Sequence, residues 1–275
     1  MERTRVEKMS RGAILFAFNS PSFNYYEMAV STAKRINHFL NLPVTVITNE
    51  ESLPEFNNYK FDNTIIVNAD KNNIREHQIW INKGRYQAYE LSPYYETLLL
   101  DTDYMVNSDK LLTVFNIYDD FCCHDTTSFL MNPGVPQEIL SAYSFNTLWA
   151  TTVVFKKSNR SRQIFECLEM VQKNYDHYCN IHSFVGGIYR NDYALTIALR
   201  IANGHSNNKR DIIPWNLVHV GKNTHIHRNY NDEFNTEYTV MYDRWKRGKI
   251  AKEYITIKDT DFHVMNKNNF MELIA

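Results

Sequence analysis

The chain has little glycine and none of the glycine-rich motifs that cradle phosphates. Only 8 of its 275 residues are glycine. Neither Gly-x-Gly-x-x-Gly nor a phosphate-binding loop ending in Gly-Lys-Ser/Thr occurs, and the pair Gly186-Gly187 alone carries little information. The sequence therefore does not predict a dinucleotide-binding or P-loop protein. No arrangement of Ser, His and Asp residues in the sequence indicates a catalytic triad, and no internal repeat is visible.

Charge of one sign is also lacking. The chain holds 30 Lys and Arg against 31 Asp and Glu, for a formal net charge of -1. No general positive field marks it as a nucleic-acid binder. A local basic patch remains compatible with that balance.

Cysteines are few and the apolar runs are short. The four cysteines, Cys122, Cys123, Cys167 and Cys179, form no Cys-x-x-Cys pair, and we expect them to be reduced packing residues. The segment 13–18 is too short for a signal peptide or a membrane span. These features lead us to expect a cytoplasmic protein.

Hydrophobic residues, at 44% of the chain, suffice for a large core. The first part alternates strand and helix patterns. Apolar runs predict strands at 12–18, 44–48 and 64–67, and helical spacing of apolar residues predicts a helix over Tyr25–Leu40. This β-α-β-β order indicates an α/β fold with a mainly parallel sheet flanked by helices.

Further elements follow, and we expect one domain over 1–275 with a less regular C-terminal part. Helices are predicted at 82–91, at 158–174 with Ser158 as N-cap, and at 192–202 with Asn191 or Asp192 as cap. Strands are predicted at 94–106, 121–124 and 148–155. An irregular loop is predicted at 126–145, and strand-like pieces at 212–213, 217–220 and 254–257.

Two aspartates follow a buried strand. Leu98-Leu99-Leu100 runs into Asp101-Thr102-Asp103, and ligands of open α/β sheets gather where such strands end. If the chain stays extended, alternate residues point the same way, so both carboxylates reach one cation. Oxygen ligands of this kind suit Mg²⁺ or Mn²⁺. The simpler alternative is a turn or strand-end cap, since Asp-x-Asp often occurs by chance.

Four short blocks, in order, resemble the GT-A fold glycosyltransferases, specifically the glycogenin-like retaining enzymes of family 8. They are Phe16-Ala17-Phe18-Asn19, Lys83-Gly84-Arg85-Tyr86 leading to Leu100-Asp101-Thr102-Asp103, Asn191-Asp192-Tyr193-Ala194-Leu195, and Phe262-His263-Val264-Met265-Asn266-Lys267. The chain departs from that family at Trp149-Ala150-Thr151, where an Asn-Ala-Gly or Asn-Ser-Gly patch is usual, and at Tyr193, where Gln is usual. The chain also resembles compact glycosyltransferase-like proteins of tailed phages, which would place it in the host cytoplasm.

The resemblance implies a GT-A-like fold with a nucleotide-binding half (about 10–110) and an acceptor and sugar half (about 111–275) that ends in a metal-binding tail. It implies transfer, with retention, from a nucleotide-diphosphate sugar, a UDP-sugar above all. The roles that it implies are metal binding by Asp101, Asp103 and His263; donor binding by Ala17, Asn19, Lys83, Arg85, Asp101 and Lys267; and catalysis by Asp192 and Asn191.

Each assignment has a simpler alternative. Lys83 and Arg85 also fit a solvated helix face. The spacing of His225 and His227 makes them rivals to His263, and Asp192 also fits a helix N-cap.

The acceptor is a glycan, a protein or a modified DNA base. Trp215 and Asn216 are candidates for an acceptor cleft. Arg244, Trp245 and Lys246 mix cations and an aromatic ring, which suits a nucleic-acid backbone or a solvated amphipathic helix end. The alternatives to a general glycosyltransferase are a phage enzyme that adds sugar to a hydroxymethylated DNA base, a non-catalytic nucleotide-sugar-binding module, and a metal-dependent nucleotidyltransferase.

Overall fold

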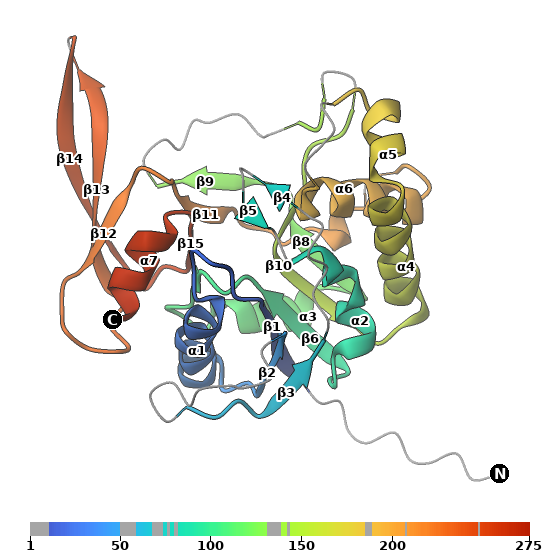
Figure 1. Cartoon of the computed structure of the whole chain (residues 1–275), viewed down its shortest axis with the longest axis horizontal. Coiled ribbons are helices and arrows are strands. Elements are labelled where there is room, and N and C mark those ends of the chain that lie inside the picture. The colour runs from blue at the N-terminus through green and yellow to red at the C-terminus, as the bar shows by residue number, and fades with distance from the viewer. Residues whose placement is uncertain are drawn as a thin grey trace.

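The computed structural model describes residues 11–49, 59–67, 74–75, 78–79, 82–130, 139–141, 144–184, 189–206, 208–246 and 248–275. Its centre is a six-stranded sheet in the order β3-β2-β1-β6-β10-β8 (Figure 1). The strands are β1 (Arg11–Ala17), β2 (Val44–Thr48), β3 (Asn63–Ile66), β6 (Glu96–Leu100), β8 (Phe121–His124) and β10 (Trp149–Lys156). Strands β3, β2, β1 and β6 are parallel, and β10 is antiparallel to both of its neighbours. The mainly parallel α/β sheet predicted from the sequence is confirmed.

The strand order places a switch point between β1 and β6. The chain leaves β1, crosses through helix α1 (Tyr25–Arg35) to β2 and β3 on one side, and later returns to pair β6 with the other side of β1. Open sheets of this kind bind ligands outside the carboxyl ends of the strands at such a point. The end of β6 is where Asp101 lies.

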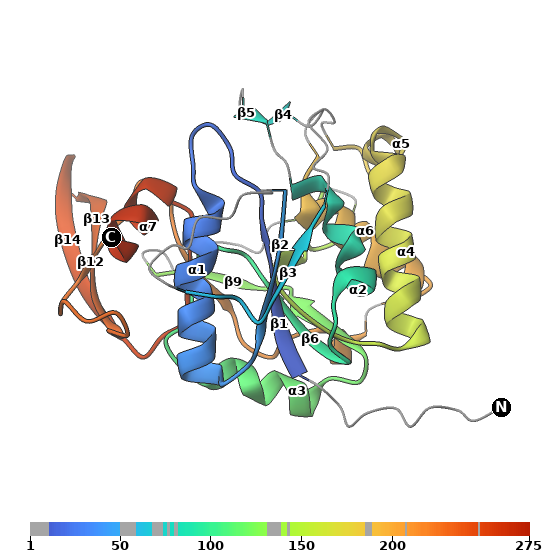
Figure 2. The same ribbon diagram turned by 60° about the horizontal axis from the view of Figure 1, so that its bottom comes forward.

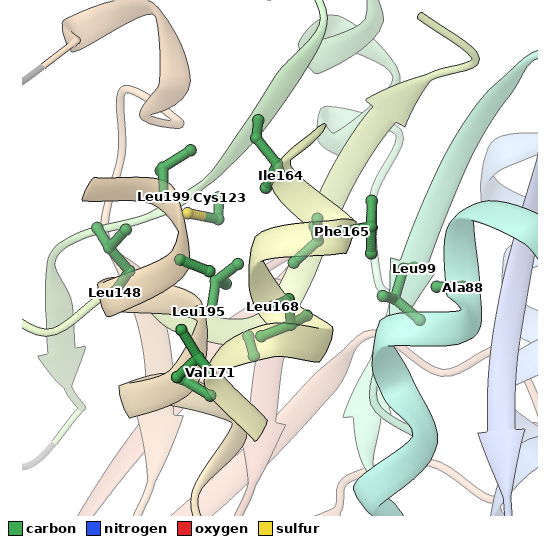
Figure 3. Packing of buried hydrophobic residues seen from close by; sticks show 14 of the residues in the cluster. Ala88, Leu99, Cys123, Leu148, Ile164, Phe165, Leu168, Val171, Leu195 and Leu199 are labelled. Atoms are coloured by element: carbon green, nitrogen blue, oxygen red, sulfur yellow. The ribbon is translucent and has the colours of Figure 1, made fainter. Parts of the chain in front are cut away.

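Helices cover both faces of the central sheet (Figures 1 and 2). On one face α1 packs Ala29 and Ala33 against a cluster that includes Leu15 and Leu98. On the other lie α2 (Ala88–Leu91), α4 (Asn159–Lys173) and α6 (Asn191–Ala202). Figure 3 shows Phe165, Leu168 and Leu195 of these helices in the layer that also holds Leu99 of β6. Strand β6 is therefore buried on both sides, as its leucines predict.

The C-terminal part is more regular than the sequence predicts. A four-stranded sheet has the order β7-β15-β11-β9, and a three-stranded antiparallel sheet has the order β12-β13-β14. Their strands are β7 (Tyr104–Met105), β9 (Thr127–Phe129), β11 (Leu217–Val220), β12 (His225–Arg228), β13 (Glu237–Lys246), β14 (Lys249–Lys258) and β15 (Phe262–Val264). Strands β13 and β14 form a hairpin that projects from the body (Figures 1 and 2). The amphipathic helix end considered around Arg244 is thus wrong.

The remaining elements are short. They are the strand pair β4 (Ile74–Arg75) and β5 (Gln78–Ile79), and the helices α3 (Val114–Ile117), α5 (Tyr175–Ile181) and α7 (Lys267–Ile274). Helix α4 begins as predicted, because the Ser158 side chain accepts a hydrogen bond from the Ser161 amide at 3.1 Å. No helix within the described ranges combines the length and apolar character that crossing a membrane requires.

Several predicted elements differ from the structure. The predicted helix 82–91 is a 3₁₀ segment, Asn82–Gln87, followed by the single turn of α2, and Gly84 inside it leaves helical geometry. The predicted helix Tyr25–Leu40 is α-helical only to Arg35 and ends in a π-helical turn, Ile36–Leu40. Part of the predicted loop 126–145 forms strand β9, while 131–138 and 142–143 lie outside the described residues.

A buried arginine joins the C-terminal part to α1. Arg35 is 3% exposed. Its guanidinium donates to the carbonyls of Val106 (2.7 Å), Glu233 (2.7 Å) and Asn235 (2.9 Å), and to the Asn107 side chain. These acceptors belong to the segment after β7 and to the loop before β13. One side chain thus connects α1, the segment after the Asp-x-Asp turn, and the three-stranded sheet.

We expect Arg35→Met to destabilise the protein by about 3 kcal/mol, because the buried carbonyls of Val106 and Asn235 lose a charged donor. Lys34→Met is the matched control, since Lys34 pairs with Glu233 at 2.5 Å near the surface, where such pairs contribute less than about 1 kcal/mol. Urea unfolding of both variants measures the difference. Equal losses in the two variants would contradict the role given to Arg35.

Candidate active site

The Asp-x-Asp segment forms a turn. Strand β6 ends at Leu100. The amide of Asp101 donates to the carbonyl of Thr151 on β10 at 3.0 Å, and the amide of Tyr104 returns to the carbonyl of Asp101 at 3.2 Å. The chain then enters β7, which belongs to the second sheet. The predicted strand 94–106 is therefore wrong beyond Leu100, and alternation along one strand does not explain how the carboxylates meet.

Pairing of β15 with β7 brings the C-terminal histidine to this turn. His263 pairs with Tyr104 across the two strands, and the amide of Val264 donates to the carbonyl of Asp103 at 3.0 Å. Potential ligand atoms of Asp101, Asp103 and His263 all lie within 4.8 Å of one another. The three residues predicted to bind metal are thus brought together, and no other such group of His, Cys, Asp and Glu occurs among the described residues.

Asp103 is a buried carboxylate with two cationic partners. Its Oδ2 lies 3.2 Å from Nε2 of His263 and also contacts Nζ of Lys267. Burial by itself would raise the pKa of Asp103, but Lys267 and His263 outweigh it and hold that pKa well below its usual range. In turn, although burial opposes their charge, Asp103 raises the pKa of both His263 and Lys267. The cluster therefore favours an ionised carboxylate at Asp103 and the charged forms of its two partners.

Asp101 has a cation of its own. Its Oδ1 contacts Nη1 of Arg85, which is 4% exposed and comes from the 3₁₀ segment before α2. Within the part of the chain that the structure describes, the buried Nε and Nη2 of Arg85 have no hydrogen-bond partner. Buried donors of this kind are rarely left unpaired. They are therefore suited to an anionic group that binds beside Asp101. The solvated helix face considered for Arg85 is wrong.

The other predicted donor-binding residues surround the ends of β1 and β6. Ala17 is the last residue of β1 and is fully buried. The side chain of Asn19 accepts a hydrogen bond from the Tyr26 amide at 2.9 Å, which shapes the turn into α1. Lys83 lies in the 3₁₀ segment, but its side chain is outside the described residues.

Asp192 is held at the start of β10. Its Oδ1 accepts from the Ala150 amide at 2.9 Å, and its Oδ2 lies 3.4 Å from Nη2 of Arg190. The N-cap position of α6 belongs to Arg190, so the predicted cap at Asn191 or Asp192 is wrong. Ala150 directly precedes Thr151, whose carbonyl binds the Asp101 amide. Asp192 thus contacts the strand that supports the Asp-x-Asp turn, and buried Asn191 precedes it on α6.

The predicted acceptor residues lie on two separate segments, one before β11 and one at the end of β13. Trp215 is half-buried with the Lys110 ammonium 4.7 Å from its ring centroid, and exposed Asn216 accepts a hydrogen bond from Thr126 at 2.7 Å. Arg244 is exposed on β13, where it pairs with Glu253 at 3.2 Å. Trp245 and Lys246 end the same strand, and their side chains are outside the described residues.

The sequence reading missed two buried histidines near the site. His219 on β11 is fully buried, with its Nδ1 2.9 Å from Nδ1 of His263. Burial, followed by the neighbouring His263 and His124, lowers the pKa of His219 to about 2. His124 ends β8 and is also fully buried, and burial lowers its pKa to about 3. The available signal was a histidine inside an otherwise apolar strand.

Comparison with known proteins finds similar structures but no matching family. No protein-family model and no curated protein matches the chain. The glycosyltransferase GlyE of Streptococcus pneumoniae TIGR4 is 12% identical, with a TM-score of 0.39 over 70% of this chain and 43% of GlyE. This chain therefore matches less than half of GlyE.

Two further solved structures are similar over more of their own length. The galactosyltransferase LgtC, in complex with donor and acceptor sugar analogs, is 14% identical, with a TM-score of 0.46 over 68% of this chain and 70% of LgtC. Mouse xyloside xylosyltransferase 1 is 9% identical, with a TM-score of 0.45 over 78% of this chain and 85% of that protein. Likenesses this distant say nothing of substrate or mechanism, so function has to be argued from the site itself.

We expect Asp192→Asn to separate a structural role of Asp192 from a chemical one. Asparagine keeps an acceptor oxygen for the Ala150 amide, so the unfolding free energy should change by less than about 1 kcal/mol. If the chain has the glycosyltransferase activity proposed below and the carboxylate stabilises charge in that reaction, loss of the charge should lower the rate of sugar release by about 100-fold or more. Urea unfolding and a nucleotide-sugar hydrolysis assay measure the two effects. An unchanged rate would leave Asp192 only a structural role.

Proposed function

We propose that the chain is a metal-dependent glycosyltransferase that moves a sugar from a nucleotide-diphosphate sugar, a UDP-sugar, to an acceptor hydroxyl. One observation carries the proposal. At the carboxyl end of β6, the carboxylates of Asp101 and Asp103 meet the imidazole of His263, and the same carboxylates contact the cations Arg85 and Lys267. Ligands for a divalent cation and donors for a diphosphate thus lie in one place.

The donor set fits a divalent cation that also binds phosphate. Two carboxylates and one imidazole leave coordination positions for phosphate oxygens and water. Carboxylates suit both Mg²⁺ and Mn²⁺, while the imidazole favours Mn²⁺, since Mg²⁺ takes oxygen ligands almost exclusively. When bound here, the cation would supply charge that stabilises the departing diphosphate.

Charge balance favours binding of the metal together with the donor. In this structure the negative charges of Asp101 and Asp103 are offset by Arg85 and Lys267. A divalent cation alone would add uncompensated positive charge to a largely buried site, and a diphosphate alone would add negative charge. Together they add no net charge. Lys267 and Arg85 are then available to donate to phosphate oxygens, where the fork of Arg85 suits paired oxygens.

The proposed catalytic groups are Asp192 and Asn191 at the start of α6. As the bond between the sugar and the diphosphate breaks, positive charge develops on the sugar, and the Asp192 carboxylate would stabilise it. Asn191 would hydrogen-bond the sugar hydroxyls. We extend the proposal to retention of configuration, which NMR of the first-formed product checks directly.

The acceptor side remains a prediction from the sequence. Trp215 and Asn216 are proposed to contact the acceptor. Among the described residues no contact joins Arg244 to the cluster of Asp101, Asp103 and His263, so no observation favours modified DNA over a glycan or protein acceptor. The Arg244→Ala variant tests the modified-DNA acceptor: if the acceptor is DNA, this variant should bind duplex DNA more weakly at low salt than the original chain does.

The direct test is calorimetry of UDP binding in Mn²⁺ with Asp103→Asn and Asp101→Asn, singly and together. We expect each variant to weaken binding at least tenfold, and the double variant about 100-fold, because ligands to the cation are lost. Asp119→Asn is the control, since Asp119 makes an exposed pair with Arg210. Release of free UDP from UDP-sugars should fall in parallel in the site variants. UDP binding unchanged in the double variant would refute the proposal.

Lys267→Met tests the charge balance. In the absence of metal, the Lys267 ammonium pairs with the Asp103 carboxylate. Removal of this ammonium should therefore tighten the binding of Mn²⁺, measured in the absence of nucleotide, by about tenfold, or ~1.4 kcal/mol. The same change should weaken UDP binding in saturating Mn²⁺, because one phosphate donor is lost. Titration of Mn²⁺ monitored by electron paramagnetic resonance, with and without UDP, measures both. A variant that binds both more weakly would contradict this account of Lys267.

A further inference from the structure

His219 lies directly behind His263, away from the carboxylates. Strand β11 pairs in parallel with β15, and this register places His219 opposite His263. The two Nδ1 atoms are 2.9 Å apart, within hydrogen-bond distance. His219 is fully buried, and the ring of Trp149 lies 4.7 Å from it between centroids. The contact is therefore built into the sheet and packed on one side by an aromatic ring.

The direction of this hydrogen bond follows from the other nitrogen of His263. Nε2 of His263 lies on the side of Asp103, 3.2 Å from its Oδ2. An imidazole binds a metal through a nitrogen that carries no proton. With Nε2 bound to a cation, the remaining proton of His263 must be on Nδ1, which then donates to Nδ1 of His219. His219 must therefore be neutral, with its own proton on Nε2.

The same hydrogen bond can also form in the metal-free protein. When His263 is protonated on both nitrogens, its Nε2 donates to Asp103 and its Nδ1 still donates to His219. Metal binding then requires the loss of only the Nε2 proton. Neither ring has to turn, and the partner on Nδ1 does not change. The site is thus preorganised on the side away from the metal.

We propose that His219 is a positioning residue that fixes the tautomer and ring orientation of His263 for metal binding. The inference rests on the proposed function, because it takes His263 as a metal ligand. His219 itself touches neither metal nor donor, and it acts only through Nδ1 of His263. Partners of this kind contribute about 10- to 100-fold in metal affinity.

Two substitutions separate positioning from packing. His219→Phe keeps a planar ring but removes the acceptor, whereas His219→Asn places an amide oxygen near the position of Nδ1. We expect His219→Phe to weaken Mn²⁺ binding at least tenfold, and His219→Asn to keep the Mn²⁺ affinity within about threefold of that of the original chain. Electron paramagnetic resonance of free Mn²⁺ measures the affinity. Equal losses in the two variants, or no loss in His219→Phe, would overturn the proposal.

A double-mutant cycle with His263→Ala tests whether His219 affects Mn²⁺ affinity through His263. If His219 acts through His263, then adding His219→Phe to His263→Ala should change Mn²⁺ affinity by less than twofold. A further tenfold loss in that background would instead mean that the substitution disturbs Asp103 or the sheet. Such a result would contradict a positioning role.

Nitrogen NMR of the metal-free chain labelled with ¹⁵N-histidine, recorded at a pH where both nitrogens of His263 carry protons, gives a readout that does not need a metal site. We expect Nδ1 of His219 to show the shift of an unprotonated acceptor and Nδ1 of His263 that of a donor. A protonated Nδ1 on His219 would overturn the proposal even if the chain binds Mn²⁺. A chain with the expected tautomers but no Mn²⁺ binding would instead refute the proposed function. This measurement uses the original chain, so it holds even if His219→Phe fails to fold.

Discussion

The negative charge of Asp103 is the constraint on which the rest of the site depends. Only 3% of this residue is exposed. Burying an unpaired carboxylate would cost a large part of the net free energy of folding of a typical domain. His263 and Lys267 compensate that charge, and Lys267 lies 164 residues further along the chain. Strand β15 and the first residue of helix α7 must therefore return to β6. The second sheet, in which β15 lies between β7 and β11, is the structure that accomplishes this return.

Arg35 supports the same return from another direction. It binds carbonyls in the segment just after β7 and in the loop before β13. Asn107, which accepts from Arg35, also donates its amide to Asp261 at 2.7 Å, two residues before His263. Helix α1, the Asp-x-Asp turn and strand β15 are thus held to one another by buried polar contacts. Apolar packing alone would fix these elements less specifically.

Much of the first half was predictable because its signals are local. Three leucines before Asp101 identify a strand buried on both faces, and apolar spacing identifies α1 and α4. The turn at Thr102 was considered only as the alternative, because Tyr104, Met105 and Val106 continue the apolar run, although β7 belongs to another sheet. Asp192 was correctly placed at the start of a helix, but its hydrogen bond to the Ala150 amide joins residues that are distant in sequence.

The histidines show the limit of local signals most clearly. Nothing in the sequence near His263 distinguishes it from His225 and His227, and its assignment came from a family resemblance. In the structure His225 and His227 are exposed on β12, whereas β15 carries His263 to the aspartates. The contact of His219 with His263 could not be foreseen, since it depends on the register of two parallel strands. Contacts that depend on strand register can be identified only once the fold is known.

The two aspartates of the motif differ in how firmly they are held. Asp103 is enclosed by two cations, and its carbonyl is bound by the Val264 amide. The side chain of Asp101 is partly exposed and contacts Arg85. Asp103 lies where the chain enters the second sheet, while Asp101 directly follows strand β6 of the central sheet. A cation bound by both would therefore connect the two sheets, and because it binds only where they meet, its binding would stabilise the folded chain.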